Sequence, residues 1–194
     1  MRFKLIPEPP ADLDRVRKAQ RAVPLVPGSE DDCCARLQRR LDFPSRDVSR
    51  TWLTFLRALD LAEETPSGFK RRSTEPTPEH LRTAFLESVM LAEDTLAELV
   101  AAGTGDDPHP LDADDVFKCT REGVPQYERH KNPNKWETIW RDRAANLLGW
   151  LALLDLAKPV DGEGNGAVDG DSTEALGDPD TEYLPTDRGV ALLG

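Results

Sequence analysis

The residues best suited to chemistry in this sequence are arginines that recur within one predicted helix. Arg46, Arg50 and Arg57 fall on the side of that helix opposite Trp52 and Leu56. A guanidinium group stays charged and donates a planar fork of hydrogen bonds, which suits phosphate oxygens and the exposed edge of guanine. The pattern favours contact with an anionic polymer.

Further cations lie on both sides of this helix in the chain. Three consecutive cations follow it directly after Phe69, and three arginines precede it on another predicted helix. The candidate DNA-contacting residues of this block are Arg36, Arg39, Arg40, Arg46, Ser49, Arg50, Thr54, Arg57, Lys70, Arg71 and Arg72. The alternative interpretation is a solvated surface on which arginines pair with carboxylates.

A second, smaller block of candidates lies in the latter half of the chain. Its members are Lys131, Lys135, Arg141 and Arg143. The stretch 161–182 that follows carries eight acidic residues and no lysine or arginine, so phosphate would repel it. This block therefore suits either DNA contact or a role in dimerisation or docking.

No pattern of residues predicts an active site. The chain has no Walker loop, no GxSxG and no HExxH motif. The acidic run 112–115 is explained by the preference of a helix amino terminus for carboxylates. The chain has three cysteines, Cys33, Cys34 and Cys119, and this odd number favours reduced thiols over a disulfide framework. We expect no catalytic residue, no metal and no cofactor.

Charge is unevenly distributed along the chain. The net charge is −11, yet residues 1–73 carry 15 Lys+Arg against 11 Asp+Glu and residues 118–158 carry 8 against 5. The intervening and final stretches, 74–117 and 159–194, are strongly acidic. Aspartate outnumbers glutamate, arginine outnumbers lysine, and only two isoleucines occur. This composition resembles proteins of halophilic archaea, so the acidity reflects the solvent and does not exclude nucleic acid.

The elements that must position the first block follow from periodicity and turn residues. Helices are predicted over 12–21 and 31–41, and a third begins at Ser45, a good amino-terminal cap. Residues 61–64 and 69–72 read as two strands joined by the turn 65–68.

The second half repeats this order with different spacing. A long helix is predicted over 78–102, another over 112–121 and a third over 136–156, with a charged connection at 122–135. A strand begins at 157–160, a Gly/Asp-rich stretch fills 161–180, and residues 182–189 close the chain.

An internal duplication links the two halves. With a shift of 95 residues, 45–63 aligns with 140–158 and eight of nineteen positions are identical. Both copies begin with Arg-Asp and end in Leu-Asp-Leu-Ala. Two copies alone indicate a duplicated domain and not a solenoid.

The order of helix, helix, short turn, helix and hairpin resembles a winged helix-turn-helix, and residues 182–189 resemble the Leu-Thr-x-x-Gly strand that ends many archaeal winged-helix regulators. The fold class this implies is mainly α with small β-hairpin wings. We expect two tandem winged-helix domains, 1–75 and 76–194, the second with a long acidic wing.

The resemblance implies a non-enzymatic double-stranded DNA-binding protein, either a transcriptional regulator or a DNA-engaging subunit, with the third helix in the major groove. The alternative is a protein–protein interaction scaffold, and a homodimer or protein partner is possible on either view. No apolar run approaches the ~20 residues of a membrane span, and no signal peptide is evident. We therefore expect a cytoplasmic protein without a membrane partner.

Overall fold

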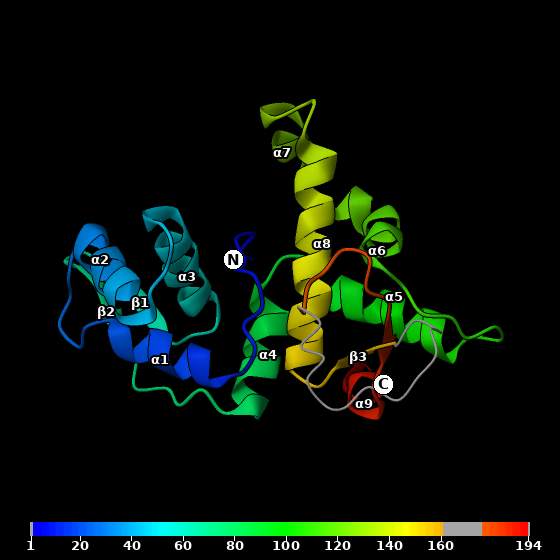
Figure 1. The fold of residues 1–194 in the computed structure, drawn as a ribbon, viewed down its shortest axis with the longest axis horizontal. Helices are drawn as coiled ribbons and strands as arrows, with labels where there is room; N and C mark the ends of the chain where they lie inside the picture. The colour runs from blue at the N-terminus through cyan, green and yellow to red at the C-terminus, as the bar shows by residue number, and fades with distance from the viewer. Residues whose placement is uncertain (1, 161–175, 194) are drawn as a thin grey trace. The chain divides into compact units, whose positions relative to one another are not determined.

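The computed structural model describes residues 2–160 and 176–193 (Figure 1). These residues form two compact units, Met1–Met90 and Leu91–Gly194. The sequence predicts a boundary at 75/76, and the units divide instead after Met90. The expected mainly-α architecture with small antiparallel hairpins is confirmed.

The first unit contains four helices and one hairpin among its described residues. They are α1 (Asp14–Ala22), α2 (Glu30–Leu41), α3 (Arg46–Ala58), β1 (Ala62–Thr65), β2 (Gly68–Arg71) and α4 (Pro78–Ser88). Helices α1, α2 and α3 pack on one another, and α4 packs on α3. Leu37, Phe55, Leu56 and Phe85 are fully buried in this core.

The wing hairpin of the first unit, β1 with β2, gains a third backbone partner from the loop before α2. Glu63 pairs with Lys70 in the antiparallel register, and Gly28 exchanges two backbone hydrogen bonds with Phe69, of 3.0 and 2.8 Å. Gly68 has a φ of 120°, and a Cβ there would overlap the carbonyl of Gly28. The tight turn therefore requires glycine at this position.

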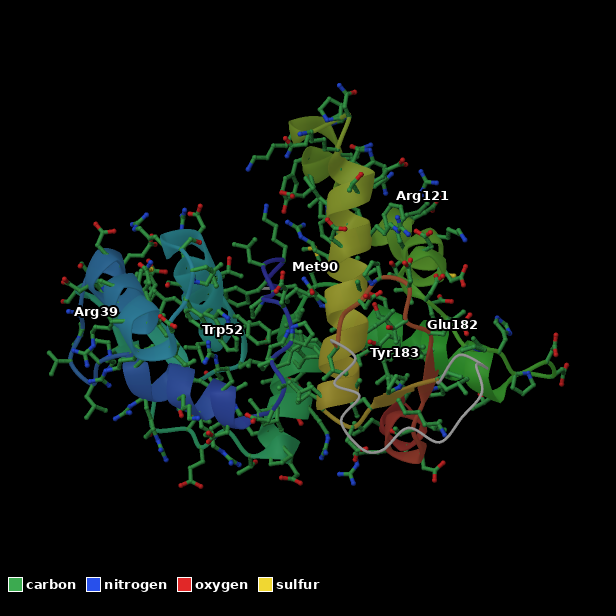
Figure 2. The ribbon with its side chains drawn as sticks, in the orientation of Figure 1. Arg39, Trp52, Met90, Arg121, Glu182 and Tyr183 are labelled. Carbon is green, nitrogen blue, oxygen red and sulfur yellow. The ribbon has the colours of Figure 1, made fainter. Side chains whose placement is uncertain are left out.

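The second unit is built on one long central helix. Its elements are α5 (Ala92–Thr104), α6 (Ala113–Thr120), the short 3₁₀ turn η1 (Arg121–Gly123), α7 (Gln126–Lys131), α8 (Trp136–Leu153), β3 (Ala157–Pro159), β4 (Tyr183–Pro185) and α9 (Asp187–Leu193). Helix α8 packs on α5, α6 and α7. Trp150 and Tyr183 are its largest fully buried side chains, and Tyr183 is marked in Figure 2.

Two predictions for the second half are wrong. The helix expected over 78–102 is divided into α4 and α5, because Phe3 donates to the carbonyl of Ser88 (2.7 Å) and accepts from the amide of Met90 (2.8 Å). These contacts hold Val89 in an extended backbone conformation, which is incompatible with an α-helix. The stretch 122–135, expected as a connection, contains the whole of α7. Residues 161–175 of the predicted acidic wing lie outside the described residues.

Within the described ranges, 2–160 and 176–193, every helix is too short or too polar to cross a lipid bilayer.

The backbone conformation at the turns that follow α3 and α8 confirms the internal duplication. Asp60 and Asp155, which the shift of 95 residues superimposes, have φ angles of 58° and 60°. In both copies the next residue donates its amide to the carbonyl five positions earlier, at 2.9 and 2.8 Å. Each aspartate pairs with an arginine from the returning segment, Arg72 at 3.1 Å and Arg188 at 3.0 Å. The shared Leu-Asp-Leu-Ala sequence therefore encodes the same left-handed turn from helix into strand.

This turn predicts a difference between two substitutions at Asp155. Glycine adopts a positive φ without steric cost, whereas an alanine Cβ crowds the following carbonyl. Both substitutions remove the carboxylate, so their comparison isolates the backbone. We expect Asp155→Gly to have a free energy of unfolding about 1 kcal/mol higher than Asp155→Ala in denaturant titrations. Equal stability of the two variants would show that the turn is not strained.

Candidate nucleic-acid interface

The connection between α2 and α3 is a tight turn fixed at both ends. Asp42 adopts the left-handed conformation with a φ of 56°. Phe43 stacks on Trp52 of α3 with ring centroids 5.5 Å apart (Trp52 is marked in Figure 2). The Ser45 side chain accepts a hydrogen bond from the amide of Val48 at 3.2 Å, as the predicted cap requires. The turn therefore sets the direction of α3 relative to α2.

Helix α3 presents only part of its predicted polar side to solvent. The side chains of Arg46 and Arg50 are 55% and 58% exposed. Thr54 is half-buried. Ser49 is fully buried, and its hydroxyl donates to the carbonyl of Ser45 at 3.2 Å, so its expected place on the exposed side is wrong. The exposed cations of α3 are concentrated at its amino-terminal half.

Carboxylates at the start of α2 pair with both exposed arginines. Arg46 pairs with Asp31 and lies 3.7 Å from Glu30, and Arg50 lies 3.4 Å from the same Glu30 oxygen. These acids occupy the first turn of α2, where the helix dipole favours negative charge. A phosphate bound to Arg46 would compete with Asp31 and Glu30, and one bound to Arg50 would compete with Glu30.

One of the two cations of the wing hairpin is paired with a carboxylate, and so is Arg57 of α3. Lys70 lies 3.1 Å from its cross-strand neighbour Glu63. Arg57 pairs with Glu64 at 2.7 Å and lies over the ring of Phe69, 5.5 Å from its centroid, so it holds the hairpin against α3. Arg71 has no side-chain hydrogen bond or ion pair with the described part of the chain. The carboxylate pairing expected by the alternative interpretation is thus present on this surface.

The three candidate arginines of α2 make contacts that do not involve Arg46 or Arg50. Arg36 donates to the carbonyl of Ala22 at 3.2 Å, and Arg40 donates to the carbonyl of Arg21 at 3.3 Å. Both therefore lie against the carboxyl end of α1. Arg39 lies at the outer edge of the unit and bonds only within its own helix (Figure 2). The structure does not group these residues with Arg46 and Arg50 through any described contact.

The second unit repeats one of these contacts. Arg141, the counterpart of Arg46, pairs with Asp114 in the first turn of α6. Arg46 pairs in the same way with Asp31 in the first turn of α2. The duplicated arginine therefore braces each third helix to the start of the preceding one. This contact explains the shared arginine without a ligand.

The remaining candidates of the second unit divide into buried and exposed. Arg143 is only 17% exposed and lies 4.5 Å from the ring centroid of Trp140, so its predicted role as a surface contact is wrong. Burial lowers the pKa of this guanidinium. Lys131 and Lys135 are exposed where α7 ends and α8 begins. Among the four candidates, these two lysines are the most exposed.

Two arginines that the sequence did not single out also lie near the hairpin. Arg17 and Arg21 of α1 line the same groove as Arg71, the last residue of β2. Their spacing of four residues places them on one side of α1, which was the available signal. Their proximity to Arg71 depends on tertiary packing and is not visible in the sequence.

Comparison with known proteins identifies the family. The profile of the halobacterial double winged helix domain matches residues 1–169. No curated protein and no solved structure matches the chain. The chain belongs to the halobacterial double winged helix family, which confirms the tandem winged-helix architecture and the halophilic composition.

Proposed function

We propose that this halobacterial double winged helix protein binds double-stranded DNA through its first unit, as a regulator or as a DNA-engaging subunit, and that it is not an enzyme. Helix α3 would enter the major groove, and the wing hairpin would follow the backbone. Arg50 would contact a base edge or phosphate, and Lys70 would contact phosphate. The observation that carries the proposal is the exposure of Arg46 and Arg50 on α3, in a winged-helix unit whose hairpin bears Lys70 and Arg71.

The ion pairs of this surface permit such binding because they are weak. An exposed pair contributes at most about 1 kcal/mol, and its partners exchange readily. Glu30 and Arg50 are 36% and 58% exposed, so water reaches both. A phosphate that offers two oxygens to a guanidinium can replace one carboxylate oxygen at 3.4 Å. The carboxylates would then moderate the affinity and would not abolish it.

This competition predicts tighter binding when one carboxylate is neutralised. Glu30→Gln removes the charge that lies near both Arg46 and Arg50. We expect the affinity for duplex DNA to rise about 3- to 10-fold, from the loss of competition and of repulsion toward phosphate. Fluorescence anisotropy with a labelled duplex measures the change. The control is Glu79→Gln, an exposed acid at the start of α4. Unchanged or weaker binding by Glu30→Gln would argue against DNA at this surface.

The proposal itself is tested by titrating the full chain against a mixed-sequence duplex of about 20 base pairs, roughly two helical turns. The titration is done across a series of potassium chloride concentrations at which circular dichroism shows a folded chain. We expect saturable binding whose affinity falls as salt rises. Absence of binding throughout the series contradicts the proposal.

A role as a protein-interaction scaffold remains the second candidate, and the second unit favours it. Leu91–Gly194 carries 9 Lys+Arg against 22 Asp+Glu. Its two candidate arginines are held by Asp114 and by the ring of Trp140. This unit offers little to phosphate and would suit a protein contact better. A stoichiometric protein partner bound to the full chain without nucleic acid would favour this function.

A further inference from the structure

A groove in the first unit lies between α1 and the segment that leaves the wing hairpin. It has a volume of about 630 Å³. Arg17, Gln20, Arg21 and Leu25 line one side, and residues 71–77 line the other. Glu75 is the one acid among these lining residues, beside four arginines.

The arginines of this groove differ from those of α3 in their partners. For Arg17, Arg21 and Arg71 the described part of the chain provides no side-chain hydrogen bond and no carboxylate partner. Arg72 alone is paired, 3.1 Å from Asp60. Four arginines and one glutamate therefore line one concave site, so the lining carries a net positive charge. Like charges in one site repel each other, and a bound anion relieves that repulsion.

The far wall of the groove is held in place by a buried side chain. Gln20 is 7% exposed, and its amide donates to the carbonyls of Arg72 and Thr74 at 3.3 and 2.6 Å. The amide of Arg71 donates to the carbonyl of Pro24 at 2.7 Å. Residues 72–77 form no helix or strand. Hydrogen bonds at Arg71, Arg72 and Thr74 nevertheless connect this segment to Gln20 of α1 and to Pro24. The backbone positions of Arg71 and Arg72 are thus set before any ligand arrives, which reduces the entropic cost of binding.

We propose that this groove is a phosphate-binding site, in which Arg17, Arg21 and Arg71 hold one phosphate group. Guanidinium groups bind phosphate oxygens through paired, charge-assisted hydrogen bonds. The hydroxyls of Ser73 and Thr74 border the same space and add neutral donors. The site shares Arg71 with the wing hairpin but does not include Arg50 of α3, and it does not depend on the proposed function.

The experiment follows the side-chain Nε–Hε resonances of arginine in the ¹⁵N-labelled full chain. Inorganic phosphate is titrated in one arm and a duplex of about 20 base pairs in the other, at matched ionic strength. We expect the resonances of Arg17, Arg21 and Arg71 to shift saturably. The double variant Arg17→Gln with Arg71→Gln should weaken the binding that these shifts report by at least about tenfold. The matched control, Lys118→Gln with Lys158→Gln, removes two exposed charges outside the groove and should leave it unchanged.

The two titrations distinguish a free phosphate compound from the phosphates of nucleic acid. Shifts with inorganic phosphate support a site for a free phosphate compound, and shifts with the duplex alone support a site for the nucleic-acid backbone. Absence of shifts in both arms overturns the proposal, as does binding that survives in the double variant. A variant altered at Arg50 and Lys70 separates the two proposals, because it should lose duplex affinity through α3 while phosphate still shifts the groove arginines.

Discussion

Replacing Phe55 with alanine is expected to bring the first unit to the limit of its stability. The ring is fully buried and packs edge-on against Trp52 and Phe85, with centroids 6.1 and 6.3 Å away. It therefore joins α3 to α4 as well as filling the core. Truncating a buried phenylalanine costs about 3–5 kcal/mol, whereas whole domains are stable by about 5–15 kcal/mol. Denaturant titration followed by circular dichroism, at fixed potassium chloride, measures the loss.

The control for this prediction is Tyr127→Ala. Tyr127 is 60% exposed, so its truncation is expected to change the free energy of unfolding by less than about 0.5 kcal/mol. A loss below about 1 kcal/mol in Phe55→Ala would mean that the packing of α3 on α4 does not support the first unit.

The second large effect is on DNA affinity. Arg50→Glu combined with Lys70→Gln removes one cation from α3 and one from the wing hairpin. Glutamine is chosen at position 70 because glutamate would face Glu63 across the hairpin. Each lost contact costs about 1–3 kcal/mol, so the affinity for duplex DNA should fall at least about 30-fold, with a shallower salt dependence. Anisotropy titrations at several salt concentrations measure both quantities.

The matched control changes the net charge by the same amount elsewhere. Lys18→Glu combined with Arg188→Gln alters two exposed cations, each paired with one carboxylate, on α1 and α9. We expect a loss of less than about threefold, from the weaker long-range field alone. If the control loses as much affinity as the test variant, net charge and not the α3 surface governs binding.

The fold could be predicted from the sequence wherever a local signal was strong. Ser45 predicted the start of α3, and residues 65–68 predicted the turn of the wing hairpin. The duplication was predicted from residue identities, and the structure shows why they are shared. Asp60 and Asp155 adopt the same left-handed turn. Arg46 and Arg141 each make an ion pair with an aspartate in the first turn of the preceding helix.

The failures have tertiary causes. Apolar periodicity predicted one helix over 78–102, but the pairing of Phe3 with residues 88–90 interrupts it. Periodicity carries no information about a segment that arrives from the other end of the unit. The error for Arg143 is similar, because Trp140 and Glu128 surround it in the folded unit.

The candidate site was predicted only in outline. The sequence located Arg46 and Arg50 on one side of α3, and the structure keeps both exposed. Their pairing with Glu30 and Asp31 could not be predicted, because it depends on how α2 lies beside α3. The groove arginines Arg17 and Arg21 were missed for the same reason.

A map of backbone amide shifts in the full chain upon addition of duplex DNA locates the bound surface residue by residue. We expect the largest shifts in the amino-terminal half of α3 and in the wing hairpin, 62–71, with saturation at the affinity found by anisotropy. Shifts confined to 91–194, or none in α3 under conditions where the duplex is bound, would contradict this expectation.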